Sequence, residues 1–272
     1  MPGLHRSLIL LAVMTGLVAC VTVEQSYTNA ALRLPENVFG DYARKINDQT
    51  DAVEAHARQV RKRPQYPAVD LTALAKHIQG HRKLPGVAYF HGCGGILNAS
   101  IDHIRALSEL DDFVIIAPDS FAADRPEYCF KNNTVDLSLR EQIDAMRQSE
   151  VRLALSRISA LPWVDKSNIF LMGHSQGGGI VAGYSGAVSI RGRILLNGGC
   201  SKWIGGNGMR ADEALLTLDT GRDPWFQRYI TRCREYVLSQ GGRSIYEADG
   251  ATHDLAASYW DEILEFIEEN RK

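Results

Sequence analysis

The sequence predicts one domain of the α/β class, with a mainly parallel, doubly wound sheet and helices on both faces. From about residue 85, short apolar runs alternate with longer segments whose apolar residues recur at helical spacing. Strands that alternate with helices form parallel sheets covered on both faces. The chain has 272 residues, enough for one large core, and its 45% hydrophobic and 23% charged residues are ordinary for a folded domain.

The expected elements follow from the length and spacing of these apolar runs. Short apolar runs predict buried strands at residues 87–90, 113–117, 169–172, 193–196, 214–218 and 244–247. One long helix is predicted at 135–161, where Leu137, Ile143 and Val151 belong to an apolar series at helical spacing. The remaining amphipathic segments predict helices at 176–188, 226–239 and 254–269.

Several classes of partner are excluded by composition and spacing. The 30 Lys and Arg residues against 32 Asp and Glu residues give a net charge of −2, without the basic excess that nucleic-acid-binding proteins normally carry. His77 and His81 are spaced for one face of a helix, but no HExxH glutamate and no third ligand accompany them. We interpret them as a surface pair, and we expect neither a metal nor another cofactor.

The first residues are expected to be a targeting segment rather than part of the fold. A short basic start precedes an uncharged apolar run at 8–18, which is the layout of a secretory signal. The run ends in Leu17-Val18-Ala19-Cys20, which resembles the lipobox of bacterial lipoproteins. This resemblance implies cleavage before Cys20 and a lipid on its thiol, and Val21 in place of Asp favours the outer membrane over the inner membrane. A plain secretory signal and an uncleaved membrane anchor are the alternatives.

These features divide the chain into three parts. We expect a signal peptide at 1–19, a lipidated N-terminus with tether and helical lead-in (about 41–62) at 20–65, and the α/β domain at 66–272. Besides Cys20, the cysteines are Cys93, Cys129, Cys200 and Cys233. An even number in an oxidising compartment favours disulfides. We therefore predict at least one disulfide among the last three.

The most specific signal is the string Gly173-His174-Ser175-Gln176-Gly177, between a predicted strand and a predicted helix. This G-x-S-x-G pattern is typical of a nucleophile elbow, in which a strained serine is exposed at the tip of a strand–turn–helix. Glycines are needed because a Cβ would collide with the neighbouring strand or helix, and the helix N-terminus favours negative charge beside the serine. We predict that Ser175 is a nucleophile rather than part of a structural glycine-rich turn.

A serine hydroxyl needs a base to take its proton and a carboxylate to orient that base. His253 is the only histidine after Ser175 and lies between the last predicted strand and the last predicted helix, so we predict that it is the base. The acid should follow the strand at 214–218. Asp219 and Asp223 both qualify by position; we favour Asp223, because its Gly/Pro turn projects the side chain, and keep Asp219 in reserve.

Two backbone N–H groups are expected to form an oxyanion hole. One belongs to Gln176, the residue after the nucleophile. The other should come from the string His91-Gly92-Cys93-Gly94-Gly95 after the strand at 87–90. We assign this donor to the N–H of Cys93, with Gly92 as the fallback. The thiol of Cys93 lacks an elbow, so we do not interpret it as a nucleophile.

Together these strings resemble the α/β-hydrolase superfamily and, within it, the dienelactone hydrolase family, over about residues 80–270. Further matching strings are Pro118-Asp119-Ser120-Phe121, Leu161-Pro162-Trp163-Val164-Asp165, Gly221-Arg222-Asp223-Pro224-Trp225 and Gly250-Ala251-Thr252-His253. The resemblance implies the α/β-hydrolase fold and a triad of Ser175, Asp223 and His253. The enzyme that names the family has a cysteine at the elbow, so with Ser175 a general ester is expected in place of dienelactone.

The sequence therefore predicts a lipid-anchored serine hydrolase of the cell envelope that cleaves a small-molecule carboxylic ester through an acyl-enzyme. A peptidase or an acyltransferase that uses the same triad is the first alternative. The second is a non-catalytic binding protein of the envelope that kept the fold. A complete triad and oxyanion loop argue against this second alternative, because a binding protein needs none of these parts.

Overall fold

The computed structural model describes residues 30–34, 36–60, 66, 83–109, 113–122, 125–126, 129, 136–200, 210, 212–225, 230–254 and 259–272. Within these residues seven strands form one sheet in the order β1-β3-β2-β4-β5-β6-β7. The edge strand β1 pairs antiparallel with β3, and all other neighbouring strands are parallel. The predicted fold class, a mainly parallel sheet between helices, is confirmed.

Each predicted strand is present, and most are slightly longer than their apolar run. The strands are β1 (Ala30–Arg33), β2 (Leu84–Phe90), β3 (Val114–Pro118), β4 (Val164–His174), β5 (Gly192–Leu196), β6 (Ala214–Thr220) and β7 (Arg243–Glu247). Every residue of β2, β3 and β5 is buried, because helices cover both faces of the sheet. Ser175, Asp223 and His253 follow the carboxyl ends of β4, β6 and β7, and ligands bind at these ends in open parallel sheets.

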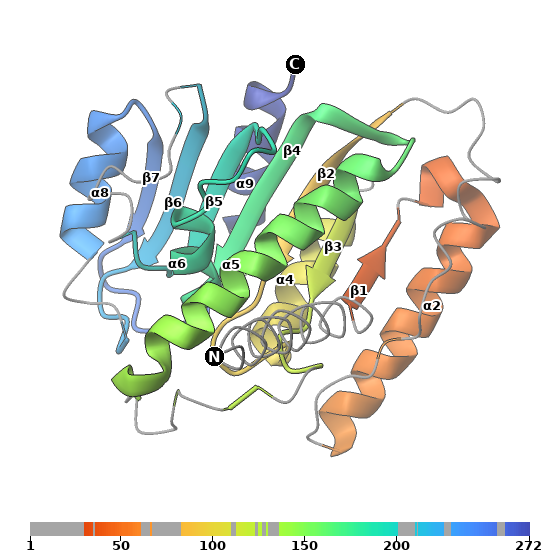
Figure 1. The fold of residues 1–272 in the computed structure, drawn as a ribbon, viewed down its shortest axis with the longest axis horizontal. Coiled ribbons are helices and arrows are strands. Elements are labelled where there is room, and N and C mark those ends of the chain that lie inside the picture. Colours follow the sequence, from red (N-terminus) through yellow and green to blue (C-terminus); the bar gives the residue numbers. More distant parts are fainter. Residues whose placement is uncertain are drawn as a thin grey trace, which may run out of the picture.

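The helices form a layer on each side of the sheet (Figure 1). They are α2 (Glu36–Val60), α4 (Asn98–Glu109), α5 (Leu137–Ala160), α6 (Gln176–Ala182), α8 (Ile230–Ser239) and α9 (Trp260–Asn270). Val151 of α5, Val181 of α6 and Val237 of α8 belong to one apolar core. Ile104 of α4 and Phe266 of α9 belong to a second core on the opposite face.

Several helix boundaries differ from the prediction. The helix predicted at 176–188 ends at Ala182, with Gly183 as its C-cap residue, whose N–H still donates to the Gly179 carbonyl. The helices predicted at 226–239 and 254–269 are described from Ile230 and Trp260 onward. We did not predict α4, although its Ile101, Ile104 and Leu107 recur three residues apart.

The sheet begins ahead of residue 66, the predicted start of the α/β domain, because β1 belongs to it. Residues of β1 and α2 are bound to the rest of the fold through Glu54, a fully buried carboxylate on α2. It accepts hydrogen bonds from Arg33 of β1 (2.8 Å) and Arg105 of α4 (3.0 Å). Burial raises the pKa of Glu54, and the two arginines oppose that rise. The segment expected to be a tether and lead-in therefore contributes an edge strand and a packed helix.

Two disulfides join loops to neighbouring elements. Cys200, after β5, is bonded to Cys233 of α8, and Cys93, after β2, is bonded to Cys129. The predicted disulfide among Cys129, Cys200 and Cys233 is thus confirmed. The proposed signal peptide, Cys20, His77 and His81 lie outside the described residues. Among the helices that are described, none has the length and hydropathy needed to cross a bilayer.

Candidate active site

Ser175 occupies a strained turn between β4 and α6. Its φ of 56° and ψ of −120° lie in a region that residues with a Cβ rarely adopt. Its N–H donates to the Leu196 carbonyl of β5 (2.9 Å), which holds the turn against the sheet. A Cβ added at Gly177 would lie 1.9 Å from the Phe90 carbonyl oxygen, and one at Gly173 would lie 2.4 Å from the Gly177 backbone. The glycines are therefore required by close backbone contacts, as the G-x-S-x-G string predicts.

Asp223 and His253 form a hydrogen-bonded pair beside this turn. The Asp223 Oδ2 and His253 Nδ1 atoms are 2.6 Å apart, and the carboxylate is fully buried while 18% of the His253 side chain is exposed. Because a carboxylate accepts, Nδ1 carries the proton, and Nε2 is the nitrogen left to accept one. The second carboxylate oxygen of Asp223 accepts from the N–H of Trp225 (2.7 Å), which fixes its orientation.

Asp219, the reserve acid, lies within β6 rather than in the loop that carries Asp223. It sits in β6 opposite Tyr246 of β7, and its Oδ2 atom is buried without a hydrogen-bond partner among the described residues. Burial raises the pKa of Asp219 to about 7, and the negative charge of Asp223 adds to the rise. Of the two candidate acids, Asp223 is the one bonded to His253.

The loop that carries His253 is attached to the elbow itself. The His174 Nε2 atom, one residue before Ser175, donates to the His253 carbonyl (2.9 Å), and the two imidazole rings lie 4.9 Å apart. Burial, together with the positive charge of His253, lowers the pKa of His174 to about 4, so its ring is neutral near pH 7.

The glycine-rich loop after β2 passes directly over the serine. A Cβ added at Gly92 would lie 3.3 Å from the Ser175 Cβ atom and 3.7 Å from its Oγ atom. The loop closes with a hydrogen bond from the Gly95 N–H to the Gly92 carbonyl (3.2 Å). Cys93 therefore lies next to the residue that touches the nucleophile. Its role, and that of Gln176, as oxyanion donors stays a prediction.

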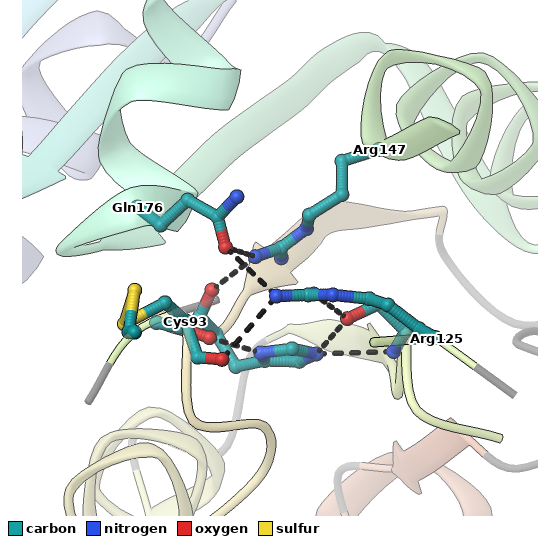
Figure 2. Close-up of a disulfide and its surroundings, with 8 residues drawn as sticks. Cys93, Arg125, Arg147 and Gln176 are labelled. Carbon is teal, nitrogen blue, oxygen red and sulfur yellow. Dashed lines mark hydrogen bonds between the residues drawn. A yellow bond between two sulfur atoms is a disulfide. The ribbon is translucent and has the colours of Figure 1, made fainter. Parts of the chain in front are cut away.

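Two buried arginines hold this loop and the residue after the nucleophile (Figure 2). Arg147 of α5 donates to the His91 carbonyl (2.9 Å) and to Gln176 Oε1 (3.0 Å). Arg125 donates to the Cys93 carbonyl (3.3 Å) and to the same Gln176 oxygen (3.3 Å). The guanidinium groups thus join both predicted oxyanion residues. Sequence reasoning missed them, because neither arginine belongs to a motif.

The ring of His91 fixes the start of the same loop. Its Nε2 atom accepts from the backbone N–H of Ser120 (3.0 Å). The proton is therefore on Nδ1, which donates to the Gly92 carbonyl (2.6 Å). Cys93 is bonded to Cys129, so its sulfur is not a free thiol. The described residues contain no cluster of three or more side chains suited to a metal ion.

Comparison with known proteins identifies the fold. The chain matches no protein-family model and no curated protein. It is similar to the crystal structure of a dienelactone hydrolase-like promiscuous phosphotriesterase, P91, from metagenomic libraries, with 18% identity, a TM-score of 0.50, and coverage of 72% of this chain and 90% of that one. It is also similar to the crystal structure of a carboxylesterase from Bacillus cereus, with 15% identity and a TM-score of 0.50. That match covers 69% of this chain and 89% of the other chain. The chain therefore has the α/β-hydrolase fold.

Proposed function

We propose that this protein is a serine hydrolase that cleaves a carboxylic ester through a covalent acyl-enzyme. The observation that carries the proposal is the position of Ser175. Its backbone is strained at the tip of an elbow, under the glycine-rich loop, and the neighbouring His174 binds the carbonyl of the histidine that Asp223 orients. Strain of this kind persists where the surrounding structure enforces it, and it is concentrated at functional sites.

The proposed reaction assigns a role to each of these residues. Ser175 Oγ attacks the ester carbonyl while His253 Nε2 takes the hydroxyl proton, and Asp223 holds the imidazole in the required tautomer. The N–H groups of Gln176 and Cys93 bind the oxyanion of the tetrahedral intermediate. His253 then gives its proton to the departing alcohol. Water, activated by the same imidazole, attacks the acyl-enzyme and releases the acid, and no cofactor takes part.

The test is covalent labelling of the nucleophile. The full-length protein is treated with a fluorophosphonate probe, and the labelled peptide is located by mass spectrometry. We expect the label on Ser175 and its loss in Ser175→Ala. Ser159→Ala is the matched control, because it removes a buried hydroxyl on α5 that has no hydrogen-bond partner among the described residues. Absence of label from folded wild-type protein would contradict the proposal and favour a binding protein.

A second measurement separates hydrolysis from transfer. Enzyme acylated on Ser175 by an activated carboxylic ester is exposed to water alone and to water with an added alcohol or amine. We expect release of the free acid in both conditions. Preferential formation of a new ester or amide would show an acyltransferase that uses the same triad, and turnover of peptides in place of esters would show a peptidase.

Membrane anchorage through Cys20 is also part of the proposal, and it rests on the string Leu17-Val18-Ala19-Cys20. Several acyl chains, at about 0.8 kcal/mol for each buried CH₂ group, anchor a protein stably. We expect the mature protein in the outer-membrane fraction with a mass that includes the lipid. Cys20→Ala should abolish both lipid mass and processing. Unchanged processing and membrane association of that variant would refute the anchor.

A further inference from the structure

We infer that Asn197 is a positioning residue that ties the loop carrying Asp223 to the loop carrying His253. The inference rests on the proposed function, because it concerns how the acid–base pair is held. Asn197 follows β5, is completely buried, and touches neither the serine nor a predicted oxyanion donor through a hydrogen bond in the described chain. It therefore acts through the two loops rather than on the substrate.

The oxygen and the nitrogen of the Asn197 side-chain amide form hydrogen bonds with different loops. Its Oδ1 atom accepts from the N–H of Thr220 (2.8 Å), the last residue of β6, three positions before Asp223. Its Nδ2 group donates to the His253 carbonyl (2.9 Å) and, more weakly, to the Thr252 carbonyl (3.4 Å). Because an amide is planar and rigid, this bridge, together with the hydrogen bond from Thr220 Oγ1 to the Thr252 carbonyl (2.6 Å), sets the spacing between the start of the acid loop and the residue that carries the base.

The backbone of Asn197 gives a second, independent observation. Its φ is 41°, and among the described residues only Ser175 is another non-glycine residue with positive φ. Asparagine tolerates this region better than most residues. The Asn197 N–H still donates to the Leu218 carbonyl of β6 (2.8 Å), so the chain turns sharply while it remains fixed to the sheet. Both strained residues therefore lie beside the same site, and strain of this kind is typical of functional positions.

The His253 carbonyl is held from two sides. Asn197 Nδ2 and His174 Nε2 each donate to it at 2.9 Å. His174 belongs to the elbow and Asn197 to the end of the next strand, so together they fix the base relative to the nucleophile. Loss of the Asn197 donor removes one of these two bonds, so the His253 Nε2 atom is held less firmly relative to Ser175 Oγ.

The first variant, Asn197→Asp, removes the donor and keeps the acceptor. Asn168→Asp is its matched control on β4, about 20 Å along the strand from His174. Asn168 is also buried and bridges through both ends of its amide, accepting from the Lys272 N–H (2.8 Å) and donating to the Lys272 carbonyl (3.2 Å). We expect Asn197→Asp to lower kcat for ester hydrolysis roughly 10- to 100-fold with KM little changed. Asn168→Asp should leave kcat at the wild-type value.

The second variant, Asn197→Gly, separates backbone strain from side-chain bonds. Glycine accepts positive φ without cost and removes both ends of the bridge. The loops retain their own backbone hydrogen bonds, from the Gly221 N–H to the Glu247 carbonyl and from the Arg222 N–H to the Gly250 carbonyl (2.8 Å each), so the fold does not depend on the amide alone. We expect a fall in kcat at least as large as that of Asn197→Asp.

A readout without substrate keeps this inference separate from the proposed function. The low-field proton resonance of the His253 Nδ1–H is recorded in Ser175→Ala protein and assigned by its loss in His253→Ala. We expect Asn197→Asp or Asn197→Gly, added to Ser175→Ala, to broaden or shift it, and Asn168→Asp to leave it unchanged. An unchanged resonance and wild-type kcat in a folded Asn197 variant would overturn the inference. Failure of wild-type labelling would refute the proposed function alone, because the resonance still tests the bridge.

Discussion

The carboxylate of Asp223 and the imidazole of His253 are 30 residues apart in the chain, and a hydrogen bond of 2.6 Å joins them. The acid is buried on the inner side of the pair, and the base reaches the partly exposed side, where a substrate can approach. An acid held in this way cannot reach the substrate, so its effect passes through the tautomer and orientation of the histidine.

Asp223→Asn should therefore lower kcat by about 10⁴-fold without loss of folding, because the amide stabilises the wrong tautomer of His253. Asp219→Asn should keep kcat near the wild-type value, since Asp219 is not bonded to His253. Ester hydrolysis by both variants, with circular dichroism as the check on folding, decides between the two acids. The reverse order of losses would identify Asp219 as the catalytic acid.

Asp219 should instead set part of the pH dependence of stability. Burial raises the pKa of Asp219 from its usual 3.8 to about 7. The folded protein keeps a proton that the unfolded chain releases, so this group's contribution to the free energy of unfolding is full below about pH 4 and is lost as pH rises to about 7. Asp219→Asn should remove that decline. Denaturant unfolding of both proteins across this window is the measurement, and parallel pH curves would contradict the expectation.

His174 should contribute to the pH dependence of stability at acidic pH. Burial, and then the charge of His253, lowers the pKa of His174 from 6.5 to about 4. The unfolded chain binds a proton below pH 6.5 that the folded protein refuses, so this contribution to stability is full above that pH and is lost as pH falls to about 4. His174→Gln should flatten this limb of the stability curve. The same slope in both proteins would show that other groups cause the acid loss.

The Cys93–Cys129 disulfide should matter for turnover as well as stability. The two disulfides close loops of nearly equal length, with separations of 36 and 33 residues. Chain entropy then assigns about 4 kcal/mol of stabilisation to each. Replacing both cysteines of either pair by Ser should cost similar stability. Only replacement of Cys93 and Cys129 should also lower kcat, by roughly 10-fold. Removal of an oxyanion donor lowers kcat by about 10²- to 10³-fold, and a donor that is only misplaced should cost less.

The control for this comparison is the Cys200 and Cys233 pair, which joins the end of β5 to α8. Thermal unfolding and ester turnover are measured for both double variants at a temperature at which each is folded. Equal turnover in the two variants would show that the Cys93–Cys129 bond has a purely structural role.

The parallel strands and the elbow could be predicted because their signals are local. The apolar runs of β2, β3 and β5 are buried on both faces of the sheet, and the G-x-S-x-G string reports backbone contacts such as that of Gly177 with Phe90. The preference for Asp223 over Asp219 came from turn chemistry, since a Gly/Pro turn projects a side chain that a strand would keep beside its neighbours.

The residues that hold the site could not be predicted, because they act across long distances in the sequence. Arg147 contacts His91, 56 positions earlier, and Asn197 contacts His253, 56 positions later. No spacing rule connects such pairs before the fold is known. The edge strand β1 was missed for a related reason: it has four residues in a polar segment, and its partner β3 lies more than eighty positions away.

That edge strand has a consequence for shortened forms of the protein. A chain that begins at residue 66 would lack β1 and would leave the backbone N–H and C=O groups of β3 unpaired along one side. The sequence of β3, Val-Ile-Ile-Ala-Pro, is entirely apolar, and an exposed apolar edge is a template for strand pairing between molecules. The short N-terminal strand thus serves as a cover that protects the sheet against aggregation.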